Sequence, residues 1–404
     1  MASTKAVHWA VGDVLEIVIE KVAHGGHFIA RHGGAVFFVR HGIPGEKCRM
    51  IITSTGSSFN RGDVIEVLEP SPDRVIAPCS YSHRAGCGGC DFQHISAARQ
   101  RQLKSDVITE QFLRIAKMDL QVEVEEVSQP LHWRTRLIAT TTSEGKLGFY
   151  GARSHTVVPV QDCIIAVENM AMPELAVRTW KGGVRVEIAT SNTDERNIAL
   201  APARGAGKAR LTEGNQILHE DVAHKTLEVS QDSFWQSHVN APAILTEAVL
   251  EFAQLQPGDH VLDLYGGVGL FTAAMIDIVG SDGSIDLIEG SKSATGDAAR
   301  NFVNNPNVKI AKGDVVKLLP RITKADVVIL DPPRDGAGKI VLSEIARLAA
   351  RAVVYVACDP AALARDTAYF LEFGYLLAKI RAFDLFPMTH HIECVALYLP
   401  AKVS

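Results

Sequence analysis

Three cysteines stand close together in the stretch CSYSHRAGCGGC, namely Cys79, Cys87 and Cys90. Thiolates in such a group bind zinc or an iron–sulfur cluster, and the spacing C-x7-C-x2-C does not by itself separate the two. Cys163 is the candidate for a fourth ligand, and it directly follows a probable strand, HTVVPVQD. A disulfide framework is disfavoured, because seven cysteines cannot all pair and the N-terminus does not read as a secretory signal.

A further cysteine, Cys358, ends an apolar run in YVACDPAALARD and is followed by Asp359 and Pro360. A lone cysteine is more often a buried apolar residue than a nucleophile. The end of a strand in an α/β sheet is, however, where ligands meet the protein, which favours a nucleophile here. The helix predicted after Pro360 can place its positive end near the sulfur and lower its pKa.

The elements that must position Cys358 alternate between strands and helices from about residue 236 onward. Apolar runs that end in turns recur in HVLDLY, SIDLIEG, VKIAKGD, ADVVILDPP and AVVYVACDP. This pattern is typical of a doubly wound α/β domain. Acidic residues follow three of these strands, at Glu289, Asp314 and Asp331, and we expect them to line one crevice at the carboxyl ends of the strands.

The glycine-rich turn YGGVG, residues 265–269, lets a ligand approach the backbone closely. The turn does not fit GxGxxG and the chain has no GxxxxGK[ST], which disfavours dinucleotide and triphosphate binding. Glu289 can bind ribose hydroxyls, and Asp314 is placed for a contact to adenine. The pattern favours adenosine without a pyrophosphate, as in S-adenosylmethionine, over a nicotinamide-binding fold with structural carboxylates.

The N-terminal part of the chain has a different pattern. Residues 13 to 70 read as short alternating strands with glycine turns, which predicts a small all-β barrel of the oligonucleotide-binding kind. Pro70 and Pro72 suggest a linker, and residues 74 to 235 read as mixed α+β with a helix roughly from 97 to 118. We therefore expect three domains, at 1–72, 73–235 and 236–404.

Composition limits the partners. The formal net charge of −5 weighs against broad electrostatic capture of nucleic acid, although not against a local basic face. No stretch approaches the ~18 apolar residues of a membrane span. We therefore expect no membrane partner, a cytoplasmic protein and, by default, a monomer.

The chain resembles the RNA 5-methyluridine (uracil-C5) methyltransferase family in five motifs, which are the cysteine stretch, VLDLYGGVGLF, LDPPRDGAG, ACDPAALARD and FPMTHHIECVALY. The resemblance covers nearly the whole chain and implies a Rossmann-like class I methyltransferase domain, preceded by a TRAM barrel. It implies that Cys358 is the nucleophile and Glu393 the general base. It also implies that S-adenosylmethionine is bound by Gln236, Tyr265, Glu289 and Asp331, and a [4Fe–4S] cluster by Cys79, Cys87, Cys90 and Cys163.

The implied reaction explains these residue types. C5 of uracil is a poor nucleophile, and a thiolate that adds to C6 turns C5 and the C4 carbonyl into an enolate that can attack a methyl sulfonium. A carboxylate then removes the C5 proton, and elimination expels the cysteine.

The implied substrate is RNA, with ribosomal RNA preferred over transfer RNA because the barrel and the cysteines look more like the ribosomal RNA members; DNA is not expected. The target uridine must leave its stack. Phe234 and Trp235 are either core or stacking residues. Basic and aromatic side chains that could line the RNA path are Arg31, Arg40, His41, Arg99, Arg101, Lys104, Trp133, Arg134 and Arg136.

Four positions depart from the family pattern. Leu270 stands where some members carry an Asn that contacts the cofactor, and Asp359 stands where Asn is common. Met388 and His390 also differ from the usual residues before the base. The alternatives are an iron–sulfur oxidoreductase and an RNA-binding or assembly factor without activity. The presence of both Cys358 and Glu393 argues against each.

Overall fold

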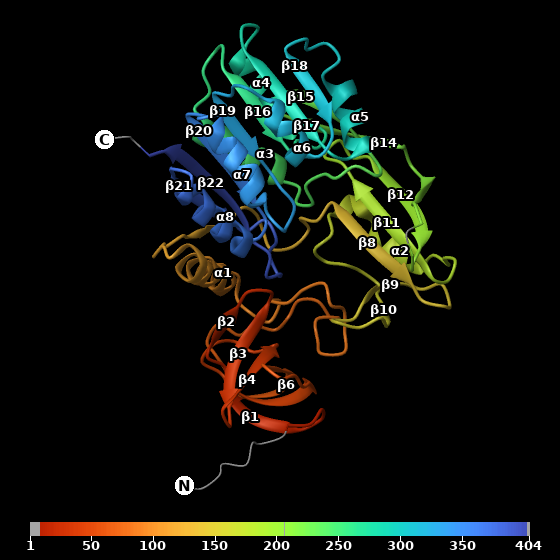
Figure 1. Cartoon of the computed structure of the whole chain (residues 1–404). Coiled ribbons are helices and arrows are strands. Elements are labelled where there is room, and N and C mark those ends of the chain that lie inside the picture. The colour runs from red at the N-terminus through yellow and green to blue at the C-terminus, as the bar shows by residue number, and fades with distance from the viewer. Residues whose placement is uncertain (1–8, 206, 402–404) are drawn as a thin grey trace.

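The computed structural model describes residues 9–205 and 207–401, which form a barrel, a central sheet and a large α/β domain (Figure 1). The barrel is a curled six-stranded sheet with the order β1-β5-β6-β4-β3-β2, as the alternating pattern predicted. Its ladder does not pair β1 with β2, so the described strands form an open barrel. Its strands are β1 Val14–Val18, β2 Lys21–Ala23, β3 His27–His32, β4 Ala35–Arg40, β5 Lys47–Ser54 and β6 Asn60–Glu69.

The segment after the barrel carries three of the cysteines in a loop and then forms helix α1, Ala97–Gln111, which continues as a π-helical turn, Phe112–Ala116. The Ser96 side chain caps α1 by accepting a hydrogen bond from the Arg99 amide. The helix ends where Lys117 takes a left-handed conformation, close to the predicted boundary.

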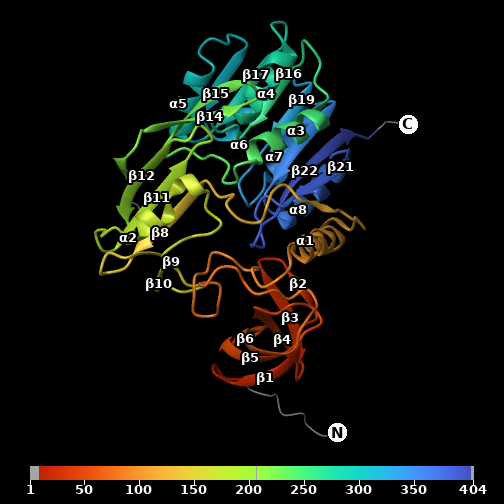
Figure 2. The ribbon, with the colours of Figure 1, turned by 180° about the vertical axis from the view of Figure 1, so that it is seen from behind.

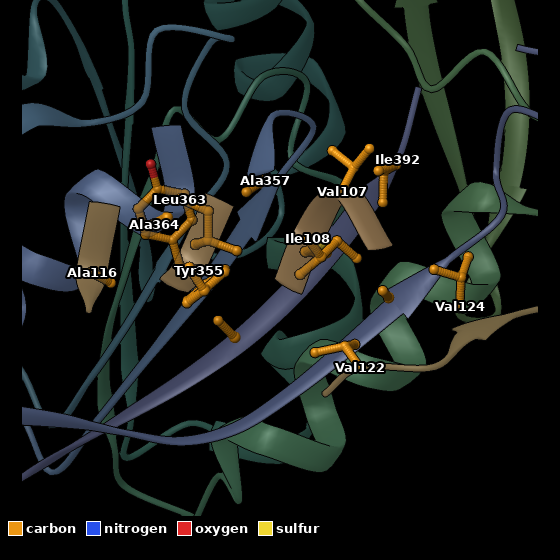
Figure 3. Packing of buried hydrophobic residues seen from close by; sticks show 14 of the residues in the cluster. Val107, Ile108, Ala116, Val122, Val124, Tyr355, Ala357, Leu363, Ala364 and Ile392 are labelled. Atoms are coloured by element: carbon orange, nitrogen blue, oxygen red, sulfur yellow. The ribbon is translucent and has the colours of Figure 1, made fainter. Parts of the chain in front are cut away.

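Helix α1 belongs spatially to the α/β domain, although the central sheet separates the two in sequence. Val107 and Ile108 of α1 lie in one apolar cluster with Ala357, Leu363 and Ile392, as Figure 3 shows. The short strand β7, Val124–Glu125, then pairs in parallel with β21 and completes the edge of the large sheet. The predicted domain boundaries remain predictions. Helix α1 and strand β7 lie within the predicted central domain, residues 73–235, but they pack in the α/β domain.

The central sheet has six strands in the order β10-β9-β8-β11-β12-β13, and a hairpin follows it. Helix α2, Met172–Val177, covers one face, and Met170, Leu175 and Val186 are fully buried in the core between them. The strands are β8 Arg136–Thr141, β9 Leu147–Tyr150, β10 Val157–Pro159, β11 Val184–Thr190, β12 Arg196–Pro202 and β13 Arg210–Glu213, with β14 Ile217–Val222 and β15 Lys225–Ser230 forming the hairpin.

Two connections join the central sheet to the α/β domain, and they run side by side. The Trp133 carbonyl accepts a hydrogen bond from the Val239 amide at 2.9 Å, and the Ser237 carbonyl accepts one from Thr135 at 2.8 Å. The rings of Trp133 and His238 stack with centroids 5.5 Å apart. Trp133 is only 1% exposed, so the prediction that its side chain lines an RNA path is wrong.

The α/β domain is built on an eight-stranded sheet with the order β18-β17-β16-β19-β20-β22-β21-β7. Strands β16 to β20 are parallel, which confirms the predicted doubly wound fold. The inner strands β16, β19 and β20 are buried along almost their whole length, which explains their continuous apolar runs, whereas the edge strand β18 has no fully buried residue. The strands are β16 His260–Leu264, β17 Ser284–Glu289, β18 Val308–Lys312, β19 Val327–Leu330, β20 Ala352–Ala357, β21 Tyr375–Phe383 and β22 Glu393–Pro400.

Helices lie on both faces of this sheet, and Figure 2 shows α3 and α4 from the side opposite to Figure 1. They are α3 Ala241–Ala253, α4 Leu270–Val279, α5 Lys292–Asn301, α6 Val315–Leu318, α7 Gly338–Arg347 and α8 Pro360–Glu372. Among the helices of the described chain, none is both long and apolar enough to span a bilayer. The expected cytoplasmic location and monomeric state stay predictions.

Candidate active site

Cys358 and Glu393 meet at the end of an antiparallel ladder. Strand β20 ends at Ala357, strand β22 begins at Glu393, and the last registered pair is Ala357 with Cys394. The next position along this register therefore sets Cys358 opposite Glu393. Glu393 is only 3% exposed, whereas Cys358 is half-buried and open to a cavity. The structure brings the predicted nucleophile and the predicted base together.

Asp331 joins this pair from the neighbouring strand, because β19 lies beside β20 and ends at Leu330. Burial and the nearby Asp331 raise the pKa of Glu393 well above its usual range, and Arg334 opposes this shift. Burial and Asp263 raise the pKa of Asp331 to about 7. Carboxyl groups this close resist ionising together, so the site is prepared for a positive charge from a ligand.

The Cys358 thiol is not activated in the ligand-free protein. Burial raises its pKa to about 12, and the charges of Glu393 and Asp331 add to that shift. The expectation that helix α8 lowers the pKa is wrong. The side-chain oxygen Oδ1 of Asp359 accepts the first free amides of α8, from Ala361 at 3.0 Å and Ala362 at 2.8 Å, so they are not left for the sulfur.

The predicted cofactor residues lie along the same edge of the sheet. The Gln236 side chain donates to Oδ2 of Asp331 at 3.3 Å. Glu289 ends β17, and its carboxylate accepts the amides of Gly267 at 3.0 Å and Ser291 at 2.6 Å. Glu289 therefore holds the glycine-rich turn of β16 against the end of β17.

Two further predicted residues complete this edge. Asp314 follows β18 and caps α6 by accepting the Val316 amide at 3.0 Å. Tyr265 follows β16 in a left-handed conformation with φ of 60°. Burial raises the pKa of Tyr265 to about 12, and the charge of Asp314 contributes, which places the two side chains near each other.

The glycine-rich turn allows no side chain at its last glycine. Gly269 has φ of +99°, and an added Cβ would lie 2.2 Å from the Phe302 ring. The next residue, Leu270, begins α4 and is 7% exposed in the apolar core. This position, which carries a cofactor-binding Asn in some family members, faces the core in this protein.

Asp263 is a site residue that the sequence analysis missed. It is 1% exposed, and its Oδ2 accepts hydrogen bonds from the Thr272 amide at 3.1 Å and hydroxyl at 2.7 Å. Its Oδ1 is buried without a hydrogen-bond partner in the described structure, and burial raises its pKa to about 6. The signal was a single acidic residue inside the apolar run HVLDLY.

All four predicted ligand cysteines line one cavity of about 560 Å³ between the cysteine loop and the central sheet. Burial raises the pKa of Cys90 to about 12, and the thiols of Cys163, Cys87 and Cys79 each add to the shift, so the four sulfurs are neighbours. The amide of Gly89 lies 3.4 Å from the Cys87 sulfur. Among the described residues, however, no group of three or more His, Cys, Asp or Glu is arranged to hold a metal ion.

The structure separates the two aromatic residues before Gln236. Both line the cysteine cavity, but Phe234 is 67% exposed, whereas Trp235 is 4% exposed and packs in the core. Lys104 is 1% exposed and donates to Asp384 at 2.6 Å, so its expected place on an RNA path is wrong.

Comparisons with known proteins agree with these positions. The profile of the tRNA (Uracil-5-)-methyltransferase family matches residues 319–401, which include Cys358 and Glu393, and that of the TRAM domain matches residues 8–65. A profile of protein-L-isoaspartate(D-aspartate) O-methyltransferase matches residues 218–328, which contain the glycine-rich turn but neither of these two residues.

Relatives extend over the whole chain. An uncharacterized RNA methyltransferase of Streptomyces coelicolor is 39% identical over 97% of this chain and 94% of its own. Another, of Corynebacterium efficiens, is 34% identical over 96% of this chain and 95% of its own. The solved structure of Pyrococcus abyssi tRNA (uracil-54, C5)-methyltransferase with S-adenosyl-L-homocysteine superposes with a TM-score of 0.72 at 22% identity, covering 95% of this chain and 99% of that one.

The barrel matches a TRAM domain, the C-terminal segment matches the uracil-specific enzymes, and full-length relatives are RNA methyltransferases. The chain therefore belongs to the TRAM-containing family of RNA uracil-C5 methyltransferases.

Proposed function

We propose that this enzyme transfers a methyl group from S-adenosylmethionine to C5 of a uridine in ribosomal RNA, with Cys358 as nucleophile and Glu393 as general base. The observation that carries the assignment of roles is the register of β20 and β22, which sets the two side chains opposite each other. A thiol and a carboxyl group at one strand end are the pair that addition to C6 and removal of the C5 proton require.

The residues of the crevice fit S-adenosylmethionine. S-adenosylmethionine supplies a methyl group on a positively charged sulfur. Asp263 presents a buried, unpartnered carboxylate oxygen, and Asp331 lies beside it with a raised pKa, so a cation there would relieve an existing repulsion. Glu289 and Asp314 end the next two strands, where ribose hydroxyls and adenine would lie.

The chain's own residues would act in a fixed order. The Cys358 thiol gives its proton to water, its sulfur bonds to C6 of the uracil, and the electron pair of the C5–C6 double bond moves into an enolate at C5 and O4. C5 takes up the methyl group. Glu393 then accepts the C5 proton, the C5–C6 double bond re-forms, and the bond from C6 to the Cys358 sulfur breaks. The thiolate is regenerated for the next cycle.

The high pKa of Cys358 bears on the order in which the methyl donor and the RNA bind. Burial is the main cause of this high pKa, and the carboxylates of Glu393 and Asp331 add to it, so a positive charge beside them would offset the second cause. We therefore expect the thiol to be more reactive when the methyl donor is bound than in the donor-free enzyme.

The cysteine cavity forms a second part of the proposal, in which Cys79, Cys87, Cys90 and Cys163 hold a [4Fe–4S] cluster. Support comes from the donor set, four thiols around one cavity of about 560 Å³, since thiolates are the ligands of such clusters. The cavity has room for a group larger than a single ion. The cluster would tie the cysteine loop to the central sheet and takes no part in the steps above.

The choice of ribosomal RNA rests on the likeness of the barrel and the cysteine loop to the ribosomal RNA members. The test is methyl transfer from labelled S-adenosylmethionine into unmodified ribosomal RNA and transfer RNA, with Cys358→Ala in parallel and nuclease digestion to identify 5-methyluridine. Label confined to ribosomal RNA supports the proposal, and label confined to transfer RNA contradicts the substrate class alone. No label in either RNA contradicts the enzymatic assignment and favours an RNA-binding protein without activity.

A further inference from the structure

A turn of the TRAM barrel lies against the loop that carries the proposed nucleophile. The turn between β2 and β3, residues 24–26, lines a cavity of about 170 Å³ together with Cys358, Asp359 and Pro360. This barrel turn is more than 300 positions from the nucleophile in sequence, as the 335-residue separation of His24 and Asp359 shows. The barrel therefore forms a wall of the space into which Cys358 opens.

His24 of the barrel turn contacts the residue that follows the nucleophile. Its Nε2 lies 2.9 Å from Oδ2 of Asp359, and the other oxygen of Asp359 caps helix α8 at Ala361 and Ala362. One carboxylate thus joins the barrel to the first turn of the helix. Because Asp359 is bonded directly to Cys358, a shift of the Asp359 backbone displaces the residue that carries the sulfur.

Gly26 of the barrel turn contacts the segment before the base. It has φ of +78°, and an added Cβ would lie 2.7 Å from Nδ1 of His390 and 3.1 Å from Cγ of Asp91. His390 and Asp91 are themselves joined at 2.6 Å. The barrel turn is therefore seated between the loop of the nucleophile and the loop that leads to Glu393.

Two of the positions at which this chain departs from the family pattern, Asp359 and His390, both face the barrel turn. An Asn at position 359 could still cap α8, because its side-chain oxygen accepts amide hydrogen bonds. It would carry no charge to pair with His24. Both departures from the family pattern therefore lie at the same contact between the barrel and the catalytic domain.

We propose that His24 is a positioning residue for methyl transfer, which fixes the loop of Cys358 through Asp359, so that the TRAM barrel forms part of the active site. The inference rests on the proposed role of Cys358. It gives the barrel a function beyond contact with RNA: the nucleophile is correctly placed only while the barrel is docked.

The charges at this contact favour an ion pair. The hydrogen bond to Asp359 raises the pKa of His24. Burial raises the pKa of Asp359, but the hydrogen bonds from His24 and the α8 amides outweigh it, so the pKa lies below its usual range. The other titratable or cationic groups that face this space from the packed elements are Lys104 of α1, Asp91, Arg334, Cys358, His390 and His391.

Two of these neighbours do not compete for the pair. Lys104 is held by Asp384 at 2.6 Å, and burial lowers the pKa of His391 to about 3, so that ring stays neutral. His24 is therefore the side chain in contact with Oδ2 of Asp359, and the contact is an ion pair when the His24 ring is protonated.

The test compares His24→Ala, Asp359→Asn and the double variant in the full-length enzyme, with kcat and KM measured on the RNA that accepts label. We expect each single variant to lower kcat by about 10- to 100-fold with KM for S-adenosylmethionine unchanged, because a small misplacement of the sulfur affects the reacting geometry. The double variant should be no slower than the slower single variant, since both changes break one contact.

The matched control is Lys21→Ala, which removes another ion pair between the barrel and α1, Lys21 with Glu110 at 2.6 Å. It should leave kcat within about twofold, because an exposed pair adds little to docking. A pH series supplies a second measurement. The ratio of wild-type activity to His24→Ala activity should be largest below the pKa of His24 and should fall towards one above it, where the ring is neutral.

Wild-type kcat in His24→Ala, or additive losses in the double variant, would overturn the inference while leaving the proposed function intact. An equal loss in Lys21→Ala would also overturn it, because general docking would then be the cause. Activity retained by Cys358→Ala would instead remove the proposed nucleophile and with it this inference.

Discussion

Glu393 faces Cys358 because β22 runs antiparallel between β20 and β21, so that its first residue lies beside the residue that directly follows β20. The last strand in the described chain is thus inserted next to the strand that delivers the nucleophile. A base at this place needs no loop of its own. Its position is set by a ladder of hydrogen bonds and by a strand whose first six residues are all buried.

The first prediction concerns the roles of these two residues. Cys358→Ala should abolish methyl transfer. The Glu393→Gln variant should still form the bond between Cys358 and C6 of the uracil. Removal of the C5 proton from this adduct should be about 10²- to 10⁴-fold slower. Such a variant should therefore accumulate a covalent complex of protein and RNA, visible as a denaturant-resistant band. Glu372→Gln, a change of the same kind in a surface pair with Lys339, is the control. Normal turnover by Glu393→Gln would refute its role as base.

The second prediction concerns activation of the thiol. Iodoacetamide should alkylate Cys358 slowly in the ligand-free enzyme, because the pKa of the thiol is about 12. S-adenosylmethionine should accelerate alkylation about tenfold or more near pH 8, since each unit by which the pKa falls raises the thiolate fraction tenfold. Peptide mass spectrometry over a pH series gives the rate at Cys358 alone.

S-adenosylhomocysteine is the matched control for this experiment, because it occupies the same site without the positive sulfur. It should leave the alkylation rate near that of the free enzyme. Equal acceleration by both compounds would show that closure of the site, and not charge, activates Cys358.

The third prediction concerns stability and pH. Asp331 has a pKa of about 7 in the folded protein and an ordinary value in the unfolded chain, so the folded state binds more protons between about pH 4 and pH 7. Stability contributed by this group therefore falls as pH rises through that window. Asp331→Asn should remove the penalty and stabilise the ligand-free protein at pH 8 by on the order of 2 kcal/mol.

Thermal unfolding at several pH values tests this, with Asp335→Asn as a control in an exposed position of the same loop. The advantage of Asp331→Asn should shrink towards pH 4 and its affinity for S-adenosylmethionine should fall. A variant that is less stable than the wild type at pH 8 would show that Asp331 is not under electrostatic strain.

The fourth prediction concerns the cysteine cavity. Protein purified without oxygen should contain about four iron and four sulfide per chain and absorb visible light, if the proposed cluster forms. Cys90→Ser should lose this iron, whereas Cys358→Ala should keep it. One zinc per chain, or no metal in either protein, would contradict the cluster.

The α/β domain could be predicted from sequence because its signals are local. Each of the strands β16 to β20 is a short apolar run, and Glu289, Asp314 and Asp331 follow their strands directly, so one rule about strand ends located all three. Asp263 carried a related local signal, a single charged residue within an apolar run, so it could have been identified from the sequence as well.

Other features depended on pairings between distant segments. The meeting of Cys358 with Glu393 requires the register of a strand that begins 35 positions later, and the contact of His24 with Asp359 requires a barrel docked on another domain. The raised pKa of Cys358 comes first from its burial in the folded chain and then from carboxylates at the ends of two other strands. None of these follows from spacing, and the resemblance supplied the roles of Cys358 and Glu393 without their geometry.

The paired connections at Trp133 and His238 restrict how the protein can move. A module on a single linker swings freely, whereas one joined by two adjacent, hydrogen-bonded segments is held at two places. The hairpin adds a further tie, because Ser230 donates hydrogen bonds to Asp297 of α5. A group bound to all four thiols would add one more, since it would join Cys163 to the cysteine loop that follows the barrel.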